Sequence, residues 1–535
     1  MQKRSLFFFV GMLFVFCSLI ARYLSLAENR AVGTLVGPST ATVTVGSARG
    51  TIYDRHLRPL VNTTKETRLC VAPYPRTLAA LSAALPAETF SLLSERLQSG
   101  RPIVTLADDT FPEVTGILRF SVPVRGGNPL YAPHLVGYLL GDNVTGAVGI
   151  EAAYNDFLNA CGGSLTATYE VNAAGNLMAD SEPLITDTLS NAAAGVVLTV
   201  DRDIQLYTES VAKKDLQKGA VVILDAATAE VLASVSVPTF QPETVADLLT
   251  APDAPLLDRT LCNYNCGSVF KIVSAAAALE SGVPTARTYT CTGSVTVDGI
   301  TFHCHNRLGH GVLDMTEAFA CSCNCYFIEL MQDTGAEALY YMAVALGFDR
   351  AVLLADNYKT ARATIPSLEE LTASPPALAN LSFGQGALLA TPYHLAQLVG
   401  TVVNGGEVHR PSVVRGTVDA GGVLTPAATT PPQTAFSAAT AETLRHMMIA
   451  AVGEGSTGTA ANPFNGGAGG KTGTAETGWI TENGRSVQNW FVGFYPAEQP
   501  RYVITVLAED SGTTGVSAAA VFHRLCDGLY SFSLQ

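Results

Sequence analysis

The feature that most constrains the fold is a pair of short apolar segments at each end of the region 196–535. Near its start, residues 220–224 and 231–237 are rich in valine, leucine and alanine. Near its end, residues 490–494 and 502–507 repeat this pattern on either side of a proline-containing turn. Short apolar segments joined by turn residues predict antiparallel hairpins. We therefore expect an α+β fold, in which one antiparallel sheet receives strands from both ends of the region and is packed by helices from its interior.

The length of 535 residues predicts two folded domains. Residues 28–187 are mixed in character, with Pro- and Gly-containing breaks and no Ser/His/Asp or metal-binding constellation. We expect them to form an elongated, non-catalytic pedestal domain. Residues 196–535 are expected to form the second domain, after a short polar and alanine-rich linker.

A predominantly apolar segment, residues 6–27, follows directly after Lys3 and Arg4. If Arg22 extends its charge to the membrane surface, the segment is long enough for one transmembrane helix. The two cations predict that residues 1–5 remain cytoplasmic and that the bulk of the chain lies on the extracytoplasmic side of the cytoplasmic membrane. The alternative is a cleaved secretory signal, because the segment ends in a small-apolar-small tripeptide.

The composition limits the classes of partner. A net charge of −14, with no dense cluster of lysine and arginine, argues against a nucleic-acid partner because phosphate binding needs a basic surface. The 48% hydrophobic and 15% charged residues are typical of a well-packed globular protein.

Ser268 and Lys271 stand at the start of an alanine-rich segment that predicts a helix ending near Gly282 and Pro284. They are one turn apart on the same face, so the amine can approach the serine oxygen. A serine hydroxyl is a weak nucleophile until a base removes its proton, and a desolvated lysine loses its own proton more readily. Because S-x-x-K is common by chance, the alternative is a helix cap with a solvated lysine.

Two further motifs follow in order. Ser322-Cys323-Asn324 has the form S-x-N, and residues 471–474 read Lys-Thr-Gly-Thr. The order S-x-x-K, S-x-N, K-T-G is that of penicillin-binding proteins and class A β-lactamases. The chain resembles class B penicillin-binding proteins, the monofunctional peptidoglycan D,D-transpeptidases, most clearly over residues 196–535. Residues 384–386, Gly-Gln-Gly, are predicted to form a turn that supports the cleft.

The resemblance implies four catalytic residues. Ser268 would attack the carbonyl of a D-Ala-D-Ala stem peptide, with Lys271 as its general base. Ser322 would relay a proton to the departing amine, and Asn324 would hold both Lys271 and the substrate amide.

The resemblance also implies a substrate-binding strand. Lys471 would supply positive charge for the terminal carboxylate of the substrate, and Thr472 and Thr474 would offer it hydroxyl groups. Gly473 would leave room for a substrate lying along the strand. The backbone N–H groups of Ser268 and Thr474 would form an oxyanion hole.

The implied partners are a D-Ala-D-Ala donor stem, an amine acceptor from a neighbouring stem, and β-lactams that acylate Ser268. A polytopic glycan polymerase of the elongation or division machinery is a further expected partner, and no cofactor is expected. If water replaced the amine, the enzyme would be a D,D-carboxypeptidase or a β-lactamase; the remaining alternative is a catalytically idle β-lactam-binding sensor or scaffold. Transpeptidation is favoured because no carboxylate that could activate water is identifiable.

The cysteines allow one specific prediction. Cys291 and Cys304 flank a predicted hairpin, residues 294–302, whose Asp-Gly turn would bring them together as a disulfide. Several potential metal ligands are close together in the sequence here: His303, Cys304, His305 and His310. Their spacing is not that of a standard zinc site, so we expect no metal.

Overall fold

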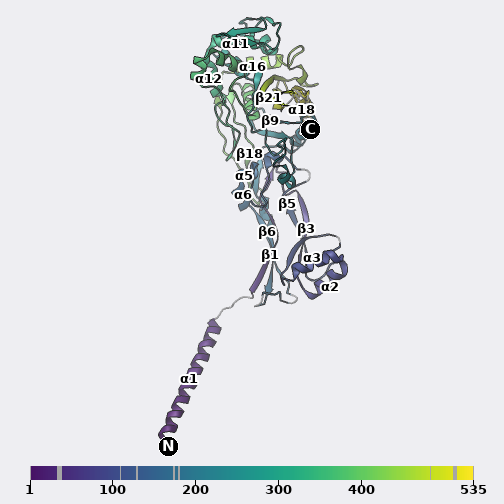
Figure 1. The fold of residues 1–535 in the computed structure, drawn as a ribbon, viewed down its shortest axis with the longest axis vertical. Helices are drawn as coiled ribbons and strands as arrows, with labels where there is room; N and C mark the ends of the chain where they lie inside the picture. The colour runs from purple at the N-terminus through teal and green to yellow at the C-terminus, as the bar shows by residue number, and fades with distance from the viewer. Residues whose placement is uncertain are drawn as a thin grey trace. The chain divides into compact units, whose positions relative to one another are not determined.

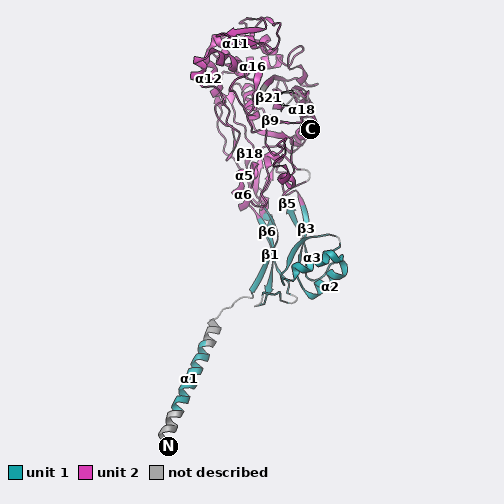
Figure 2. Cartoon of the chain, in the orientation of Figure 1, with its two compact units in different colours: residues 1–48, 65–123, 163–190 teal, residues 49–64, 124–162, 191–535 magenta. Residues whose placement is uncertain are grey.

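The computed structural model describes residues 2–32, 39–108, 110–127, 130–141, 143–172, 175–178, 181–481, 484–509 and 515–533 (Figure 1). The chain forms two compact units, each built from separate segments (Figure 2). Unit 1 contains Met1–Ala48, Lys65–Pro123 and Gly163–Ser190, and unit 2 contains Arg49–Thr64, Val124–Gly162 and Asn191–Gln535. Two segments from the predicted pedestal region thus belong to the same unit as the second predicted domain. The division into a pedestal and a catalytic domain by function remains a prediction.

The described part of unit 1 holds two small sheets and, besides the N-terminal helix, two further helices. The first sheet has the order β1-β6-β7, from β1 (Ser39–Ala48), β6 (Gly163–Val171) and β7 (Leu184–Asp187). The second has the order β4-β3-β5, from β3 (Thr64–Val71), β4 (Ile103–Leu106) and β5 (Ile117–Val124). The helices α2 (Pro75–Ala84) and α3 (Ala87–Leu97) contribute Leu81 and Leu93 to a core that also contains Leu69 of β3.

The predicted membrane segment, residues 6–27, lies within the helix α1 (Gln2–Val32). Its described side chains, at residues 9–25, are all exposed. Within the described part of the chain, no helix combines the length and the apolar character needed to cross a membrane. The transmembrane anchor therefore remains a prediction.

Unit 2 is organised around the predicted antiparallel sheet. Its five strands have the order β10-β9-β23-β22-β21, and every neighbouring pair is antiparallel. The strands are β9 (Gly219–Asp225), β10 (Val231–Val237), β21 (Gly469–Thr481), β22 (Gly484–Tyr495) and β23 (Tyr502–Ala508). Both predicted hairpins are confirmed, and β9 from the first pairs with β23 from the second. The sheet therefore joins the two ends of the region, and β21 lies at one edge of it.

Helices cover both faces of this sheet. Because successive strand residues point to opposite sides, neighbouring residues of one strand pack against different helices. Val221 packs with α7 (Arg202–Asp215) and α18 (Ala518–Ser533) in one apolar cluster. Its neighbour Val222 belongs to the other cluster, with residues of α15 (Pro392–Val403). The sheet is consequently buried on both faces.

Unit 2 is rich in helices, and most of them come from the middle of the sequence region 196–535, as predicted (Figure 1). Besides those named above, its helices are α4 (Pro133–Val136), α5 (Gly149–Ala153), α6 (Asn155–Ala160), α8 (Val245–Leu248), α9 (Lys271–Glu280), α10 (Met315–Ala320), α11 (Asn324–Thr334), α12 (Ala336–Ala345), α13 (Leu368–Ala373), α14 (Pro375–Ser382) and α16 (Ala438–Ala450).

Smaller sheets complete unit 2. A four-stranded sheet has the order β19-β18-β8-β2, from β2 (Thr51–Tyr53), β8 (Gly195–Leu198), β18 (Val414–Val418) and β19 (Leu424–Pro426). Two-stranded pairs are β11 (Tyr289–Cys291) with β14 (Gly311–Leu313), β12 (Ser294–Val297) with β13 (Ile300–His303), β15 (Leu353–Ala355) with β16 (Tyr358–Lys359), and β17 (Glu407–Val408) with β20 (Gln433–Thr434).

Candidate active site

Ser268 lies on a 3-10 turn, η3 (Gly267–Phe270), that leads directly into α9. Gly267 has a φ of +54°, and a Cβ at this position would lie 2.6 Å from the carbonyl oxygen of Thr474. Glycine is the residue that tolerates both this dihedral angle and this close approach. The residue before Ser268 therefore allows the turn to pack directly against strand β21.

Lys271 is fully buried and connects the first two motifs. Its Nζ atom donates hydrogen bonds to Ser322 O (2.7 Å), Ser322 Oγ (3.2 Å) and Asn324 Oδ1 (2.7 Å). Burial lowers the pKa of Lys271 to about 8, against an opposing effect of nearby cysteine thiols. Because this pKa is close to neutral pH, a useful fraction of the amine is unprotonated and able to accept a proton.

Ser322 lies between α10 and α11, and Asn324 is the first residue of α11. Ser322 has a φ of 56°, in the left-handed region that is unusual for a residue other than glycine. Cys323 caps α11, where its Sγ accepts a 3.5 Å hydrogen bond from Tyr326 N. Asn324 Nδ2 donates to His303 O at 3.2 Å. The Asn324 amide is thus held from both ends, by Lys271 and by the main chain at His303.

The Lys-Thr-Gly-Thr motif lies on the edge strand β21. Lys471 is fully buried, with its Nζ atom 3.3 Å from Thr472 O. Burial lowers the pKa of Lys471 well below its ordinary value, and the charge of Lys271 lowers it further. Two buried amines near one another disfavour protonation of both at the same time.

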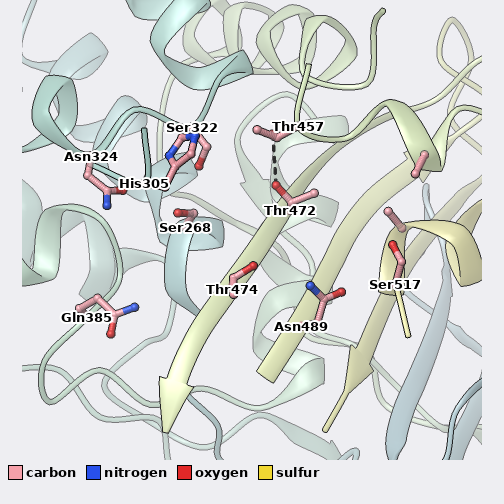
Figure 3. Close-up of a pocket in the computed structure, with 12 residues that line it drawn as sticks. Ser268, His305, Ser322, Asn324, Gln385, Thr457, Thr472, Thr474, Asn489 and Ser517 are labelled. Atoms are coloured by element: carbon pink, nitrogen blue, oxygen red, sulfur yellow. Dashed lines mark hydrogen bonds between the residues drawn. The ribbon is translucent and has the colours of Figure 1, made fainter. Parts of the chain in front are cut away.

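The three motifs meet at one cavity of about 650 Å³. Five of the predicted site residues line it: Ser268, Ser322, Asn324, Thr472 and Thr474 (Figure 3). The two lysines are buried: Lys271 makes hydrogen bonds to Ser322 and Asn324, and Lys471 makes one to Thr472. The structure therefore brings together three motifs that are far apart in the sequence.

Gly473 is required for a reason that differs from the predicted one. The sequence suggested that glycine leaves room for a substrate. A Cβ at Gly473 would instead lie 2.6 Å from Cys266 O and 2.8 Å from Val269 Cγ2. Glycine is therefore needed here so that β21 can pack against the segment that carries Ser268.

Sequence reasoning missed several residues that line the cavity: His305, Gln385, Thr457, Ala460, Asn489, Ser517 and Ala519. Thr457 lies next to the motif strand, because Thr472 Oγ1 donates to Thr457 Oγ1 at 3.2 Å (Figure 3). Asn489 pairs with Thr474 across β21 and β22. Nothing in the local sequence marks these two residues, since their placement depends on strand register and tertiary packing.

The sequence did mark Gln385, because it lies between two glycines in a predicted turn. A Cβ at Gly384 would lie 1.9 Å from Gly267 O, so the predicted supporting turn does pack against the segment before Ser268. The turn also places the Gln385 side chain at the cavity (Figure 3). Gln385 is thus a candidate substrate contact as well as part of a supporting turn.

The predicted hairpin at residues 294–302 is confirmed by β12 and β13, but the predicted Cys291–Cys304 disulfide is wrong. Both residues are free thiols. Cys304 Sγ lies 3.9 Å from Cys323 Sγ and 3.5 Å from His310 Nδ1. Tertiary packing thus brings Cys323, at the start of α11, and His310, just before β14, to Cys304 in addition to Cys291.

The fold and the site define a class of protein: an α+β domain with a serine at the start of a helix, a buried lysine three residues later, and a Lys-Thr-Gly strand at the edge of its main sheet. Residues 219–527 match the family model described as the penicillin binding protein transpeptidase domain, and the chain belongs to this family.

Named relatives support this assignment. The chain is 33% identical over 341 residues to the peptidoglycan D,D-transpeptidase PbpA of Mycolicibacterium smegmatis, covering 57% of this chain and 66% of that protein. It is 30% identical over 397 residues to the stage V sporulation protein D of Bacillus subtilis, covering 71% of this chain and 59% of that protein. The chain thus covers less than two thirds of the length of these two relatives.

A solved structure shows the same fold. The D,D-transpeptidase domain of a peptidoglycan glycosyltransferase from Eggerthella lenta aligns with a TM-score of 0.65 at 25% identity, covering 91% of this chain and 99% of that one.

Proposed function

We propose that this chain is a peptidoglycan D,D-transpeptidase that cross-links stem peptides through an acyl-enzyme on Ser268. The observation that carries the proposal is the environment of Lys271: a fully buried amine, held by Ser322 and Asn324, beside the cavity that contains Ser268. The family to which the chain belongs and the names of its relatives support the same reaction.

Acylation begins when Ser268 Oγ attacks the carbonyl carbon of the penultimate D-alanine, while its proton passes to Lys271 Nζ. The bond from this carbon to the terminal D-alanine nitrogen then breaks. Ser322 Oγ, 3.2 Å from Lys271 Nζ, passes a proton on to the leaving nitrogen. Free D-alanine leaves, and the rest of the donor stem remains as an ester on Ser268.

The edge position of β21 suggests how the donor binds. An extended peptide can add alongside an edge strand through main-chain hydrogen bonds. In this position its terminal carboxylate reaches the hydroxyls of Thr472 and Thr474, and its negative charge favours the protonated form of the Lys471 amine behind them. The developing oxyanion accepts hydrogen bonds from the backbone N–H groups of Ser268 and Thr474.

The lining of the cavity favours an amine over water as the acceptor. Among the described residues that line it, none is an aspartate or a glutamate. A carboxylate that activates water is the feature associated with deacylation in class A β-lactamases. The acyl group therefore waits for the amine of a second stem, whose nitrogen forms the cross-link as Ser268 recovers its proton. A β-lactam, which offers the same reactive amide, acylates Ser268 and remains bound.

We also propose that α1 anchors the chain in the cytoplasmic membrane, with the cavity on the extracytoplasmic side and a polytopic glycan polymerase as partner. The apolar sequence of residues 6–27 supports the anchor, as do large exposed side chains such as Phe14 and Phe16, which are 75% and 65% exposed. Extraction of cell membranes with alkaline carbonate tests this proposal: an anchored chain stays in the pellet, and a chain found in the supernatant refutes it.

The acyl-enzyme is tested first with a fluorescent penicillin. The full chain is labelled, denatured and measured by gel and by intact mass, in parallel with Ser268→Ala and with the exposed helix-end control Ser281→Ala. We expect one stable adduct on the parent and on Ser281→Ala, and none on Ser268→Ala. An intact antibiotic and an unlabelled, folded parent would contradict the proposal.

The acceptor is tested next with a D-Ala-D-Ala stem peptide and a second stem that carries a free amine. A cross-linked dimer as the main product supports transpeptidation. If the shortened donor alone accumulates at every acceptor concentration, the chain is a D,D-carboxypeptidase.

A further inference from the structure

A cluster of metal-binding side chains lies next to the S-x-N motif and has no part in the reaction proposed above. It consists of Cys291, Cys304, His310 and Cys323. One ligand atom of each residue lies within 4.8 Å of those of the other three. The three cysteines are buried, with at most 4% of their surface exposed. We propose that these four side chains bind one structural zinc ion.

Two separations within the cluster match a tetrahedral metal, and the ligand atoms all lie within 4.8 Å of one another. With Zn–S bonds of about 2.3 Å and Zn–N bonds of about 2.0–2.1 Å, a tetrahedron requires S···S separations of about 3.8 Å and S···N separations of about 3.5 Å. Cys304 Sγ lies 3.9 Å from Cys323 Sγ and 3.5 Å from His310 Nδ1. These separations leave room for a zinc ion between the ligands. They are far too long for a disulfide, whose S–S bond is about 2.05 Å.

The chemistry of the donors selects zinc. Three thiols and one imidazole form the Cys₃His set that is common in structural zinc sites, and soft thiolate ligands exclude calcium and magnesium. With four protein ligands the coordination is complete, so no position remains for water or substrate. The proposed ion is therefore structural rather than catalytic.

The backbone around the cluster holds the ligands together from distant segments. Cys304 N donates to Gly293 O at 3.0 Å, which ties the Cys304 segment to the loop after Cys291. A Cβ at Gly309 would lie 2.4 Å from Cys291 O, so the loop before His310 packs directly on the end of β11. The spacing in the sequence is C-x₁₂-C-x₅-H-x₁₂-C, with no short C-x-x-C pair. This spacing explains why the sequence alone did not indicate a zinc site.

One of the four proposed ligands, Cys323, would connect the ion to the active site. Cys323 is the central residue of the S-x-N motif, between Ser322 and Asn324. Binding of its sulfur to a metal would fix the turn that presents these two residues to Lys271. Zinc would thus join the motif to the segments at β11, β13 and β14 and hold it in place.

Two further candidate ligands lie close to the cluster. His305 Nδ1 is 3.9 Å from Cys304 Sγ, and the Cys325 thiol also interacts with Cys304. His305 lines the cavity. The proposal assigns the metal to the four residues whose ligand atoms all lie within 4.8 Å of one another, and therefore predicts that Cys325 can be replaced without loss of the ion.

The test is the zinc content of the full chain, purified in mild detergent from zinc-supplemented cells and measured by inductively coupled plasma mass spectrometry. We expect one zinc per chain for the parent and for two control variants, Cys325→Ser and the more distant Cys161→Ser. We expect at least a tenfold lower content for Cys304→Ser and Cys323→Ser. A parent with no zinc, even after incubation with Zn²⁺ under reducing conditions, overturns the proposal, as does a loss of zinc confined to Cys325→Ser.

A second measurement does not require the ligand variants to fold. The parent is stripped with a chelator and reloaded with Co²⁺. A tetrahedral thiolate site gives intense sulfur-to-cobalt charge-transfer absorption and strong visible bands, whereas a weak spectrum typical of octahedral cobalt overturns the proposal. Both measurements are made without a β-lactam or a stem peptide, so their outcome is independent of the proposed reaction.

Discussion

Lys271 Nζ donates a 2.7 Å hydrogen bond to Asn324 Oδ1 across a separation of 53 positions in the chain. This contact places the amine between the turn that carries Ser268 and the start of α11. The Asn324 amide is itself held by His303 O, so it fixes the orientation of the Lys271 amine, whose pKa is also lowered. The geometry therefore supports a general base whose position is determined by a second motif.

Replacing Lys271 with methionine removes this base while filling most of its volume. We expect the second-order rate constant for acylation by a fluorescent penicillin to fall about 100- to 10,000-fold, the usual contribution of a positioned general base. The melting temperature should not fall by more than a few degrees, because the buried amine no longer has to be desolvated. Lys359→Met, at an exposed position, is the control. An unchanged acylation rate in the folded variant would remove Lys271 from the mechanism.

The pH dependence of acylation follows from the lowered pKa of Lys271. Below its pKa of about 8 the amine is protonated and cannot accept the serine proton. We therefore expect the acylation rate to rise about tenfold per pH unit below this value and to level off above it. The titratable groups that act on the amine or lie near it are Cys304, Cys321, Cys323, Cys325 and Lys471. Labelling rates measured between about pH 6 and 10 check this, and a rate that falls over this range would contradict it.

Gly473→Ala tests the packing between β21 and the Ser268 turn. The added carbon would meet Cys266 O at 2.6 Å and Val269 Cγ2 at 2.8 Å, so the strand must move away from the turn. We expect a loss of stability of about 1–3 kcal/mol, typical of overpacking, and a much slower acylation of Ser268. Thermal unfolding and penicillin labelling measure the two effects.

Gly400→Ala is the matched control for this substitution. A Cβ at Gly400, within helix α15, would have no atom within 4 Å. This variant should keep its stability or gain up to about 1 kcal/mol from the better helix propensity of alanine. If the two variants behave alike, the close approach of β21 to the turn is not required.

The sheet and the motif residues were predictable because their signals are local. Residues 220–224 and 231–237 are apolar runs separated by a turn, and the structure forms this hairpin. Ser268, Ser322 and Thr472 were found because each lies in a short motif of known chemistry. Their meeting at one cavity followed from the resemblance and not from the spacing.

The features that were missed depend on contacts between distant segments. Cys304 was paired with Cys291 alone because both flank a hairpin, whereas the fold also brings Cys323, at the start of α11, and His310, just before β14, to it. Asn489 reaches the cavity through strand register. The interleaving of the two compact units was also not visible, because the segments 49–64 and 124–162 carry no change in composition that marks them as part of unit 2.

These two segments are joined by a buried carboxylate, Glu151, whose two ion pairs yield a final prediction. Arg49 Nε lies 3.0 Å from Glu151 Oε2, and Arg125 Nε lies 2.6 Å from Glu151 Oε1. The Glu151 side chain is only 2% exposed. Burial lowers the pKa of Arg49, while Glu151 raises it. The carboxylate therefore compensates two guanidinium groups that have lost much of their hydration.

Glu151→Gln removes this charge and leaves both guanidinium groups without a counterion. Breaking a buried pair in this way costs about 3–5 kcal/mol, because an uncompensated charge remains in the interior. We expect a clearly lower melting temperature by calorimetry, while the exposed control Glu337→Gln should stay close to the parent. The loss should be larger at low salt, where screening of the two positive charges is weakest. Equal melting temperatures for Glu151→Gln and Glu337→Gln would mean that the pair contributes no net stability to unit 2.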